Sequence, residues 1–270
     1  MHGVNDSAFL DQLLQTRSRY LALGNESFEA EGSFFIRNLE TPRRYDANHV
    51  AMARTATLEA IDSLLARMER EFLPSQAKII HVDPLTPTEL VARLELDGGY
   101  ERERGLFLVL EGEPKAAPRP GIDLRLVTDE AQWDAYAELA AIDYADFMAQ
   151  QSREVAAGLL EEFHVSKRLK TPPVRNWMAY VDDRAVAFFS SWEGANEIGV
   201  VEDLFTHPDY RHRGLATALL LRCIEDARSH GAGPILIAAN PDDTPKQMYA
   251  AMGFVPRFIV TEYRKPPRES

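Results

Sequence analysis

Cysteine is almost absent from this chain, which has a single cysteine, Cys223, among 270 residues. One cysteine can form neither an intramolecular disulfide nor a zinc cage of cysteine ligands. The seven histidines are scattered and no His-Glu-x-x-His motif occurs, so we expect no metal site. So little cysteine is typical of a reducing compartment and favours a cytoplasmic location.

The chain also has no long apolar run, and it has fewer basic than acidic residues. No run approaches the roughly 18 residues that a bilayer span needs. The opening residues MHGVNDSAFLDQ lack the basic and apolar regions of a signal peptide. The chain has 30 basic and 42 acidic residues, which gives a net charge of −12. Such a charge repels phosphate backbones and mildly attracts small cations. We therefore expect neither a nucleic-acid nor a membrane partner.

The remaining composition is that of a globular protein, with 45% hydrophobic and 27% charged residues. The length is sufficient for two domains of ordinary size. The segment 113–121 contains three prolines and a glycine, which cannot continue a helix or a central strand. This segment predicts a boundary between a domain at 1–118 and a second at 119–270.

Hydrophobic periodicity predicts alternating strands and helices in both parts of the chain. In the first part, the expected helices are 7–21, 56–72 and 86–98, and the expected strands are 27–37, 77–82 and 106–111. In the second part, the expected strands are 122–127, 177–181, 185–192, 198–206, 234–239 and 259–263, with helices beginning at 128 and covering 144–163, 214–230 and 244–253. Gly99-Tyr100 and Gly253-Phe254 precede the last strand of each part. This order predicts an α/β fold with an internal duplication, although any α/β chain can show a similar order.

The most informative segment is 200–216, where a strand leads through a tight loop into a helix. Backbone N–H groups at a helix start lack internal partners, and the helix dipole adds positive charge there. Such a start is an anion site suited to a phosphate or pyrophosphate. Gly214 permits close approach of a ligand, and Arg211 and Arg213 add positive charge. Neither a Walker loop nor a G-x-G-x-x-G fingerprint is present.

Three motifs resemble the GNAT N-acetyltransferase superfamily. The segment 211–216 reads R-x-x-G-x-A and resembles the family's acyl-CoA pyrophosphate loop. His207-Pro208-Asp209-Tyr210 resembles the approach to that loop, and 249–254 resembles its Y-x-x-x-G-F segment. The resemblance covers about 121–270 and implies a GNAT-type mixed sheet flanked by helices. The order of elements in the first part implies a tandem arrangement with a degenerate first half.

The resemblance implies transfer of an acetyl group from acetyl-CoA to a primary amine by direct attack, without a metal. The loop amides would hold the pyrophosphate, and the backbone at the end of the preceding strand would pair with the pantetheine. The implied cofactor-binding residues are Leu204, Phe205, Thr206, Arg211, His212, Arg213, Gly214, Leu215, Ala216 and Asn240. Asn240 departs from the family spacing, because 241–243 lengthens the loop by about two residues and leaves Asp242 as an alternative.

Tyr249 is the tyrosine of the Y-x-x-x-G-F segment and the candidate proton donor to the departing thiolate. A tyrosine with a reference pKa of about 10 stays protonated at neutral pH. The alternative is a tyrosine that only packs on a short amphipathic helix.

Glu202 falls where polyamine acetyltransferases of the superfamily carry a proposed base, and Asp203 is the alternative. Strand alternation predicts that the two carboxylates lie on opposite faces. Leu204 and Thr206 would share the face of Glu202, and Phe205 that of Asp203. Burial would raise the pKa of either carboxyl toward that of a useful base, unless it forms a salt bridge instead.

The remaining candidates carry less information. Tyr144 and Phe147 are expected to line the acceptor site, and Cys223 to be a buried apolar residue. The first half has no glycine in 39–48, the segment expected to precede its 56–72 helix, and Glu95 stands at the position that matches Tyr249. We expect this half to pack against the second and shape its acceptor cleft.

Two readings from other classes stay open: a non-catalytic acyl-CoA-binding or sensing module, and an interaction scaffold with an empty fold. The expected partner is a small-molecule amine, but amino acids, polyamines, antibiotics, other metabolites and protein termini all fit. A homodimer formed through an edge strand or a helix is compatible with the sequence.

Overall fold

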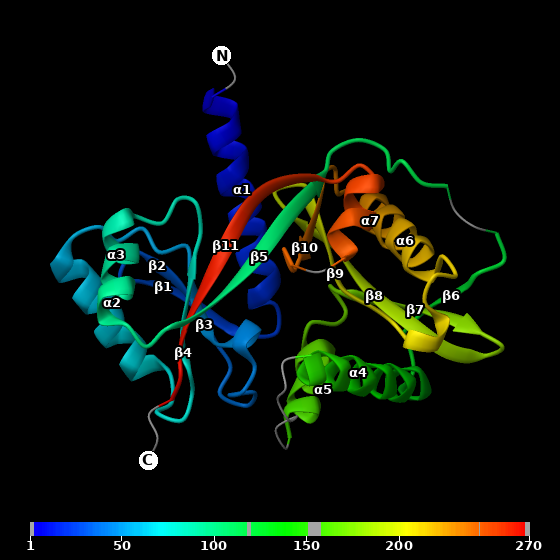
Figure 1. Cartoon of the computed structure of the whole chain (residues 1–270), viewed down its shortest axis with the longest axis horizontal. Coiled ribbons are helices and arrows are strands. Elements are labelled where there is room, and N and C mark those ends of the chain that lie inside the picture. Colours follow the sequence, from blue (N-terminus) through cyan, green and yellow to red (C-terminus); the bar gives the residue numbers. More distant parts are fainter. Residues whose placement is uncertain (1–2, 118–119, 151–157, 243, 268–270) are drawn as a thin grey trace. The chain divides into compact units, whose positions relative to one another are not determined.

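The computed structural model describes residues 3–117, 120–150, 158–242 and 244–267. They form two compact units (Figure 1). Unit 1 contains Met1–Leu108, Ala238–Gln247 and Pro256–Ser270, and unit 2 contains Val109–Ile237 and Met248–Val255. The two units therefore exchange segments and do not follow one cut in the chain. The expected cut between 118 and 119 lies outside the described residues.

Unit 1 is a mixed sheet with helices. Its elements are α1 Gly3–Ala22, β1 Glu26–Ala30, β2 Ser33–Arg37, β3 His49–Ala51, α2 Leu58–Glu71, β4 Lys78–Val82, α3 Thr88–Asp97, β5 Glu101–Leu110 and β11 Val255–Lys265. The strand order is β1-β2-β3-β4-β11-β5. Strands β1 to β3 are antiparallel, β3 and β4 are parallel, and β11 is antiparallel to β4. The last strand of the chain thus completes the sheet of unit 1.

Two expectations for unit 1 were wrong. The expected strand 27–37 is a hairpin, because Glu31 and Gly32 take left-handed φ values of 48° and 63° and reverse the chain. The short strand β3 was not expected, so the strand-to-helix loop of this unit is 52–57 and not 39–48. In that loop Thr57 caps α2, its hydroxyl accepting a hydrogen bond from the amide of Ala60 at 3.3 Å.

Unit 2 repeats the same plan. Its elements are β6 Asp123–Leu126, α4 Glu130–Gln150, α5 Leu159–Leu169, β7 Arg175–Val181, β8 Arg184–Ala195, β9 Ile198–Thr206, α6 Leu215–Ser229, β10 Ile235–Ala239 and the end of α7 Pro245–Ala251. Strands β6 to β9 are antiparallel, and β10 joins β9 in parallel through α6. Both units therefore end an antiparallel series with a parallel crossover, as the predicted duplication requires.

Helix α4 is longer at its C-terminus than the sequence predicted. It reaches Gln150, whereas a separate helix was expected over 144–163, and 151–157 lie outside the described residues. Asp129 caps α4: its Oδ1 accepts from the amide of Gln132 at 2.8 Å. The Gln132 side chain in turn accepts from the amide of Asp129 at 3.2 Å. This reciprocal cap fixes the start of the helix.

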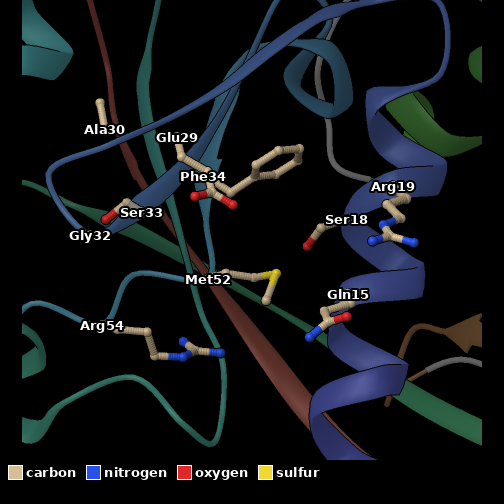
Figure 2. Close-up of a pocket in the computed structure, with 10 residues that line it drawn as sticks. All are labelled: Gln15, Ser18, Arg19, Glu29, Ala30, Gly32, Ser33, Phe34, Met52 and Arg54. Atoms are coloured by element: carbon tan, nitrogen blue, oxygen red, sulfur yellow. The ribbon is translucent and has the colours of Figure 1, made fainter. Parts of the chain in front are cut away.

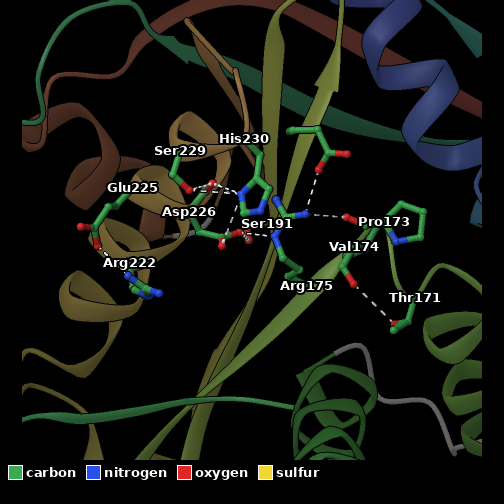
Figure 3. A network of polar contacts seen from close by, with 11 residues as sticks. Thr171, Pro173, Val174, Arg175, Ser191, Arg222, Glu225, Asp226, Ser229 and His230 are labelled. Atoms are coloured by element: carbon green, nitrogen blue, oxygen red, sulfur yellow. Dashed lines mark hydrogen bonds and ion pairs between the residues drawn. The ribbon is translucent and has the colours of Figure 1, made fainter. Parts of the chain in front are cut away.

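The two faces of the unit 2 sheet carry different helices. Asp226 of α6 accepts hydrogen bonds from Arg175 Nε at 2.5 Å and from Ser191 Oγ at 2.6 Å (Figure 3). The neighbouring side chains on the opposite face, including Phe188, pack against Tyr136 of α4 and Phe163 of α5. Helix α6 therefore covers one face, and α4 with α5 covers the other.

Cys223 is buried in α6, as predicted, and burial raises the pKa of its thiol well above the ordinary value. Across the described segments, no helix is both long and apolar enough to span a bilayer.

Candidate active site

The loop between β9 and α6 combines a short turn with two left-handed residues. The turn Pro208–Tyr210 is closed by the amide of Tyr210, which donates to the carbonyl of His207 at 2.9 Å. His212 and Gly214 then take φ values of 63° and 83°. A left-handed φ is easily adopted by glycine, which explains the glycine at the position before α6.

The first amides of α6 are available to a ligand. The first main-chain bond of the helix runs from the amide of Ala218 to the carbonyl of Gly214 at 3.0 Å. The amides of Leu215, Ala216 and Thr217 precede it, and no main-chain acceptor for them exists in the described part of the chain. Gly214 offers no capping side chain. Such donors, together with the positive end of the helix dipole, are the groups that bind anions at helix N-termini, which makes this turn a candidate anion site.

The two loop arginines donate hydrogen bonds to backbone carbonyls of the segment that precedes α6. Arg211 donates from Nε to the carbonyl of Thr206 at 3.1 Å and pairs through Nη2 with Asp146 at 3.3 Å. Arg213 donates to the carbonyl of Asp209 at 3.0 Å. Both side chains are exposed, so their positive charge is accessible at the rim.

Strand β9 contains a bulge beside the loop. Ser190 of β8 is opposite Glu202, whereas Phe188, two residues away, is opposite Phe205, so β9 carries one extra residue. Asp203 lies in this bulge with a left-handed φ of 66°. Phe205 consequently shares the face of Glu202, and the strict alternation predicted from sequence was wrong.

The bulge brings two carboxylates toward the same helices. The face shared by Glu202 and Phe205 is the one that α4 and α5 cover. The side chain of Asp203 also reaches α5, where it forms an ion pair with Lys167. The prediction that Glu202 and Asp203 lie on opposite faces was therefore wrong as well.

A group of charged side chains surrounds Asp143 of α4. Burial is the largest cause of its raised pKa, followed by the negative charges of Asp203 and Asp146. Lys167 and Arg211 oppose the shift, and the pKa of Asp143 is raised to about 7. Asp143 can therefore both accept and release a proton near neutral pH.

Sequence reasoning missed Asp143, Asp146 and Lys167. Two carboxylates three residues apart share one side of a helix, so the Asp143 and Asp146 pair was a usable signal. Lys167 offered none, because only the fold shows that this lysine is 3% exposed.

Tyr144 and Phe147, the two residues expected to line the acceptor site, lie in different environments. Tyr144 packs with its ring centroid 5.5 Å from that of Phe163, between α4 and α5. Phe147 is 43% exposed and so is accessible.

The remaining predicted residues lie on α7 and before it. Tyr249 is 3% exposed, and its neighbour Met248 contacts Thr217 of α6, with Oγ1 and Sδ 3.9 Å apart. This end of α7 is therefore close to the first turn of α6. Asn240 belongs to unit 1, and its Oδ1 accepts from the amide of Asp242 at 2.8 Å. Asp243 lies outside the described residues.

No group of three or more His, Cys, Asp or Glu side chains that could hold a metal ion occurs within the ranges that the structure describes.

Residues 133–254 match the family model described as the acetyltransferase (GNAT) family. Among solved structures, a GCN5-related N-acetyltransferase from Kribbella flavida aligns over 98% of this chain and 97% of its own, with a TM-score of 0.65 and 14% identity. A functionally unknown conserved protein from Staphylococcus epidermidis ATCC 12228 aligns over 91% and 96%, with a TM-score of 0.66 and 13% identity.

A tandem GNAT protein from the clavulanic acid biosynthesis pathway aligns over 78% of this chain and 69% of its own, with a TM-score of 0.51 and 17% identity. No curated protein matches the chain. At these identities the solved structures show the fold alone, and they confirm the predicted tandem α/β arrangement.

Proposed function

We propose, from the premise that residues 133–254 form an acetyltransferase domain of the GNAT family, that the chain moves an acetyl group from acetyl-CoA to a primary amine. One observation carries this proposal. Arg211, in the loop before α6, pairs with Asp146, and Asp146 lies within electrostatic reach of Asp143, a carboxyl with its pKa near 7. The site thus offers backbone donors for a phosphate and, on the neighbouring helix α4, a proton acceptor.

The residues present suit acetyl-CoA. The amides of Leu215, Ala216 and Thr217 would bind its pyrophosphate, with Arg211 and Arg213 at the rim. The backbone of Leu204–Thr206 would pair with the pantetheine. Thr206 Oγ1 is itself buried without a hydrogen-bond partner in the described residues, so the pairing is assigned to the backbone of this segment and not to that side chain. Bound there, acetyl-CoA supplies an acyl carbon activated as a thioester.

The proton movements follow from the carboxylates. An amine must lose its proton before it can attack, and Asp143 accepts that proton. The nitrogen lone pair then forms the amide bond while the carbon–sulfur bond breaks. Tyr249 donates its hydroxyl proton to the departing thiolate and takes up the second proton that the nitrogen releases as the amide forms, so the tyrosine ends the reaction neutral. Asp203 is paired with Lys167, so Asp143, whose pKa is raised to about 7, is the better base. Glu202, on the sheet face that α4 and α5 cover, is assigned as the anchor for the amine.

The charge of the site favours a cationic acceptor. Asp143 of α4 lies within electrostatic reach of Asp146 and of Asp203 in the β9 bulge, which gathers carboxylates there in a chain with a net charge of −12. A small amine with a second positive charge would be bound more tightly than a neutral amine. The proposal includes a cytoplasmic location, which accords with the single cysteine.

A thiol-release assay tests the proposal. Wild-type protein is given acetyl-CoA with a panel of polyamines, amino acids and aminoglycosides, beside the variants Ala216→Glu and Ala216→Gln. A glutamate in the first turn suits the helix dipole but repels a pyrophosphate, whereas glutamine has the same shape without the charge. We expect release with wild type and Ala216→Gln and a loss of about 10²-fold or more with Ala216→Glu. Binding of acetyl-CoA without release from any amine would favour the sensing module instead.

A further inference from the structure

Unit 1 contains a cavity of about 800 Å³ that the transfer reaction does not use. Three segments line it: the α1 residues Gln15, Ser18 and Arg19, the β1–β2 hairpin, and the residues that follow β3 (Figure 2). This volume lies within the range of about 300–1,000 Å³ found for small-molecule sites.

The cavity lies where ligands commonly bind in α/β folds. Met52 and Arg54, which line it, come directly after β3. Strand β3 is antiparallel to β2 and parallel to β4, so the strand direction changes there. In open α/β sheets ligands bind in crevices outside the carboxyl ends of the strands, and this cavity lies at the carboxyl end of β3. Strand β9 holds the same position in the topology of unit 2, where it leads to the candidate active site.

This cavity is not a second acyl-CoA site of the unit 2 kind. The loop from β3 to α2 contains no glycine, and Thr57 already occupies the first turn of α2 by accepting from Ala60. The start of that helix therefore offers less to a pyrophosphate than the start of α6.

The cavity walls are held in place before any ligand binds. The amide of Arg54 donates to the carbonyl of Gly32 at 2.9 Å, and Thr55 Oγ1 donates to the carbonyl of Glu31 at 2.7 Å. These two bonds tie the hairpin turn to the segment after β3. Preorganised walls lower the entropic cost of binding.

The polar groups of the cavity favour an anion. Two of its lining side chains are guanidinium groups, Arg19 and Arg54, against one carboxylate, Glu29. Asp83 holds Arg54 through Nη1 at 3.0 Å, while Nη2 is buried and has no acceptor in the described residues. Arg19 is exposed, and no carboxylate pairs with it among the residues that the structure describes. Guanidinium groups bind carboxylates in paired, planar geometry.

The rest of the lining is suited to an apolar body. Figure 2 shows Phe34 and Met52 extending from the strand side of the cavity toward α1, from which Gln15 and Ser18 extend in the opposite direction. Ser18 is 2% exposed, so its hydroxyl lies at the inner wall. We infer that unit 1 binds a small organic carboxylate, with its carboxylate at Arg19 and Arg54 and an apolar group against Phe34 and Met52.

Calorimetric titration with hippurate, a carboxylate that carries one aromatic ring, tests this inference. Its uncharged amide, hippuramide, is the matched ligand control. We expect hippurate to bind wild-type protein at concentrations up to about 10 mM and hippuramide to bind at least about ten-fold more weakly. We expect acetyl-CoA to bind equally well with and without hippurate, because the two sites are separate. Hippurate binding can therefore be measured whether or not the proposed transfer reaction occurs.

Three variants locate the binding. Arg19→Gln and Arg54→Gln should each weaken hippurate by about ten-fold or more, whereas Arg104→Gln, an exposed arginine of β5 outside the cavity, should not. Replacement of Arg54 also unpairs Asp83 and can unfold unit 1, but the exposed Arg19 is free of this problem. Absence of hippurate binding to wild type, equal binding of hippuramide, or full affinity in Arg19→Gln would each overturn the inference.

Discussion

Replacing Asp143 with asparagine should make the protein more stable and less active at the same time. Burial beside Asp203 and Asp146 raises the pKa of Asp143 from 3.8 to about 7. Between these two pH values the folded state keeps a proton that the unfolded state has lost. Stability therefore falls as the pH rises through this window, and the cost is complete above pH 7.

The size of the effect follows from the shift. A pKa raised by about three units opposes folding by at most about 4 kcal/mol at pH 8. Asparagine removes this cost, because it stays neutral at every pH. Each kcal/mol corresponds to about 2–4 °C in the unfolding midpoint. The midpoint of Asp143→Asn should exceed that of wild type at pH 8, and the difference should shrink toward pH 4.

The activity should change in the opposite direction. If Asp143 accepts the proton of the amine, kcat/KM of wild type rises with pH to a plateau above about 7. Asp143→Asn should abolish this rise and reduce kcat/KM by about 10²–10⁴-fold. Both quantities can be measured on one preparation, by scanning fluorimetry and by thiol release from pH 5 to 9.

Asp134→Asn is the matched control, because Asp134 is an exposed carboxylate on the same helix. It should leave both profiles unchanged. Asp143 is not the base if Asp143→Asn keeps the pH dependence of kcat/KM, and its pKa is not raised if the midpoint of the variant follows that of wild type at every pH.

Three further substitutions have defined outcomes. Tyr249→Phe should lower kcat by about 10²-fold with little change in acetyl-CoA affinity, and an unchanged kcat would remove its role as donor. Asp226→Asn should lower the free energy of unfolding by about 3–5 kcal/mol in urea titrations, because it leaves Arg175 without its buried partner; a loss below about 1 kcal/mol would contradict that account. Gly199→Ala should cost about 1–3 kcal/mol by the same measurement, since a Cβ there would lie 2.8 Å from Ile235 Cδ1 of β10. A neutral effect would contradict this and mean that the Ile235 side chain moves aside.

The sequence alone predicted those features of the fold that depend on neighbouring residues. The order of helices and strands in unit 2 followed from hydrophobic periodicity, and the loop before α6 followed from Gly214 and its neighbours. The structure confirms a left-handed Gly214 at the start of the helix and a buried Cys223 within it.

Features that depend on distant partners were not predictable in the same way. The bulge at Asp203 adds one residue to β9, and alternation cannot reveal it because the pattern of burial simply shifts by one. The short strand β3 has three residues, too few to show a period. The place of β11 beside β4 is decided by tertiary pairing and not by local propensity.

The raised pKa of Asp143 also depends on residues that are distant in the sequence. A carboxylate on a helix is ordinarily solvated, and its sequence neighbours do not indicate burial. Only the packing of α4 against the bulge of β9 brings Asp203 close enough to perturb it. The base proposed from sequence, Glu202, was chosen because its position resembles that of a proposed base in polyamine acetyltransferases, whereas the structure adds a candidate on a helix.

The central claim is that the first turn of α6 holds the pyrophosphate of acetyl-CoA. Titration calorimetry of acetyl-CoA, free CoA and NAD into wild type, Ala216→Glu and Ala216→Gln tests it most directly. We predict that both CoA species bind wild type and Ala216→Gln, that NAD does not, and that Ala216→Glu loses binding while remaining folded. Equal affinity of Ala216→Glu and wild type for acetyl-CoA, or no binding to wild type at about 1 mM, would contradict the claim.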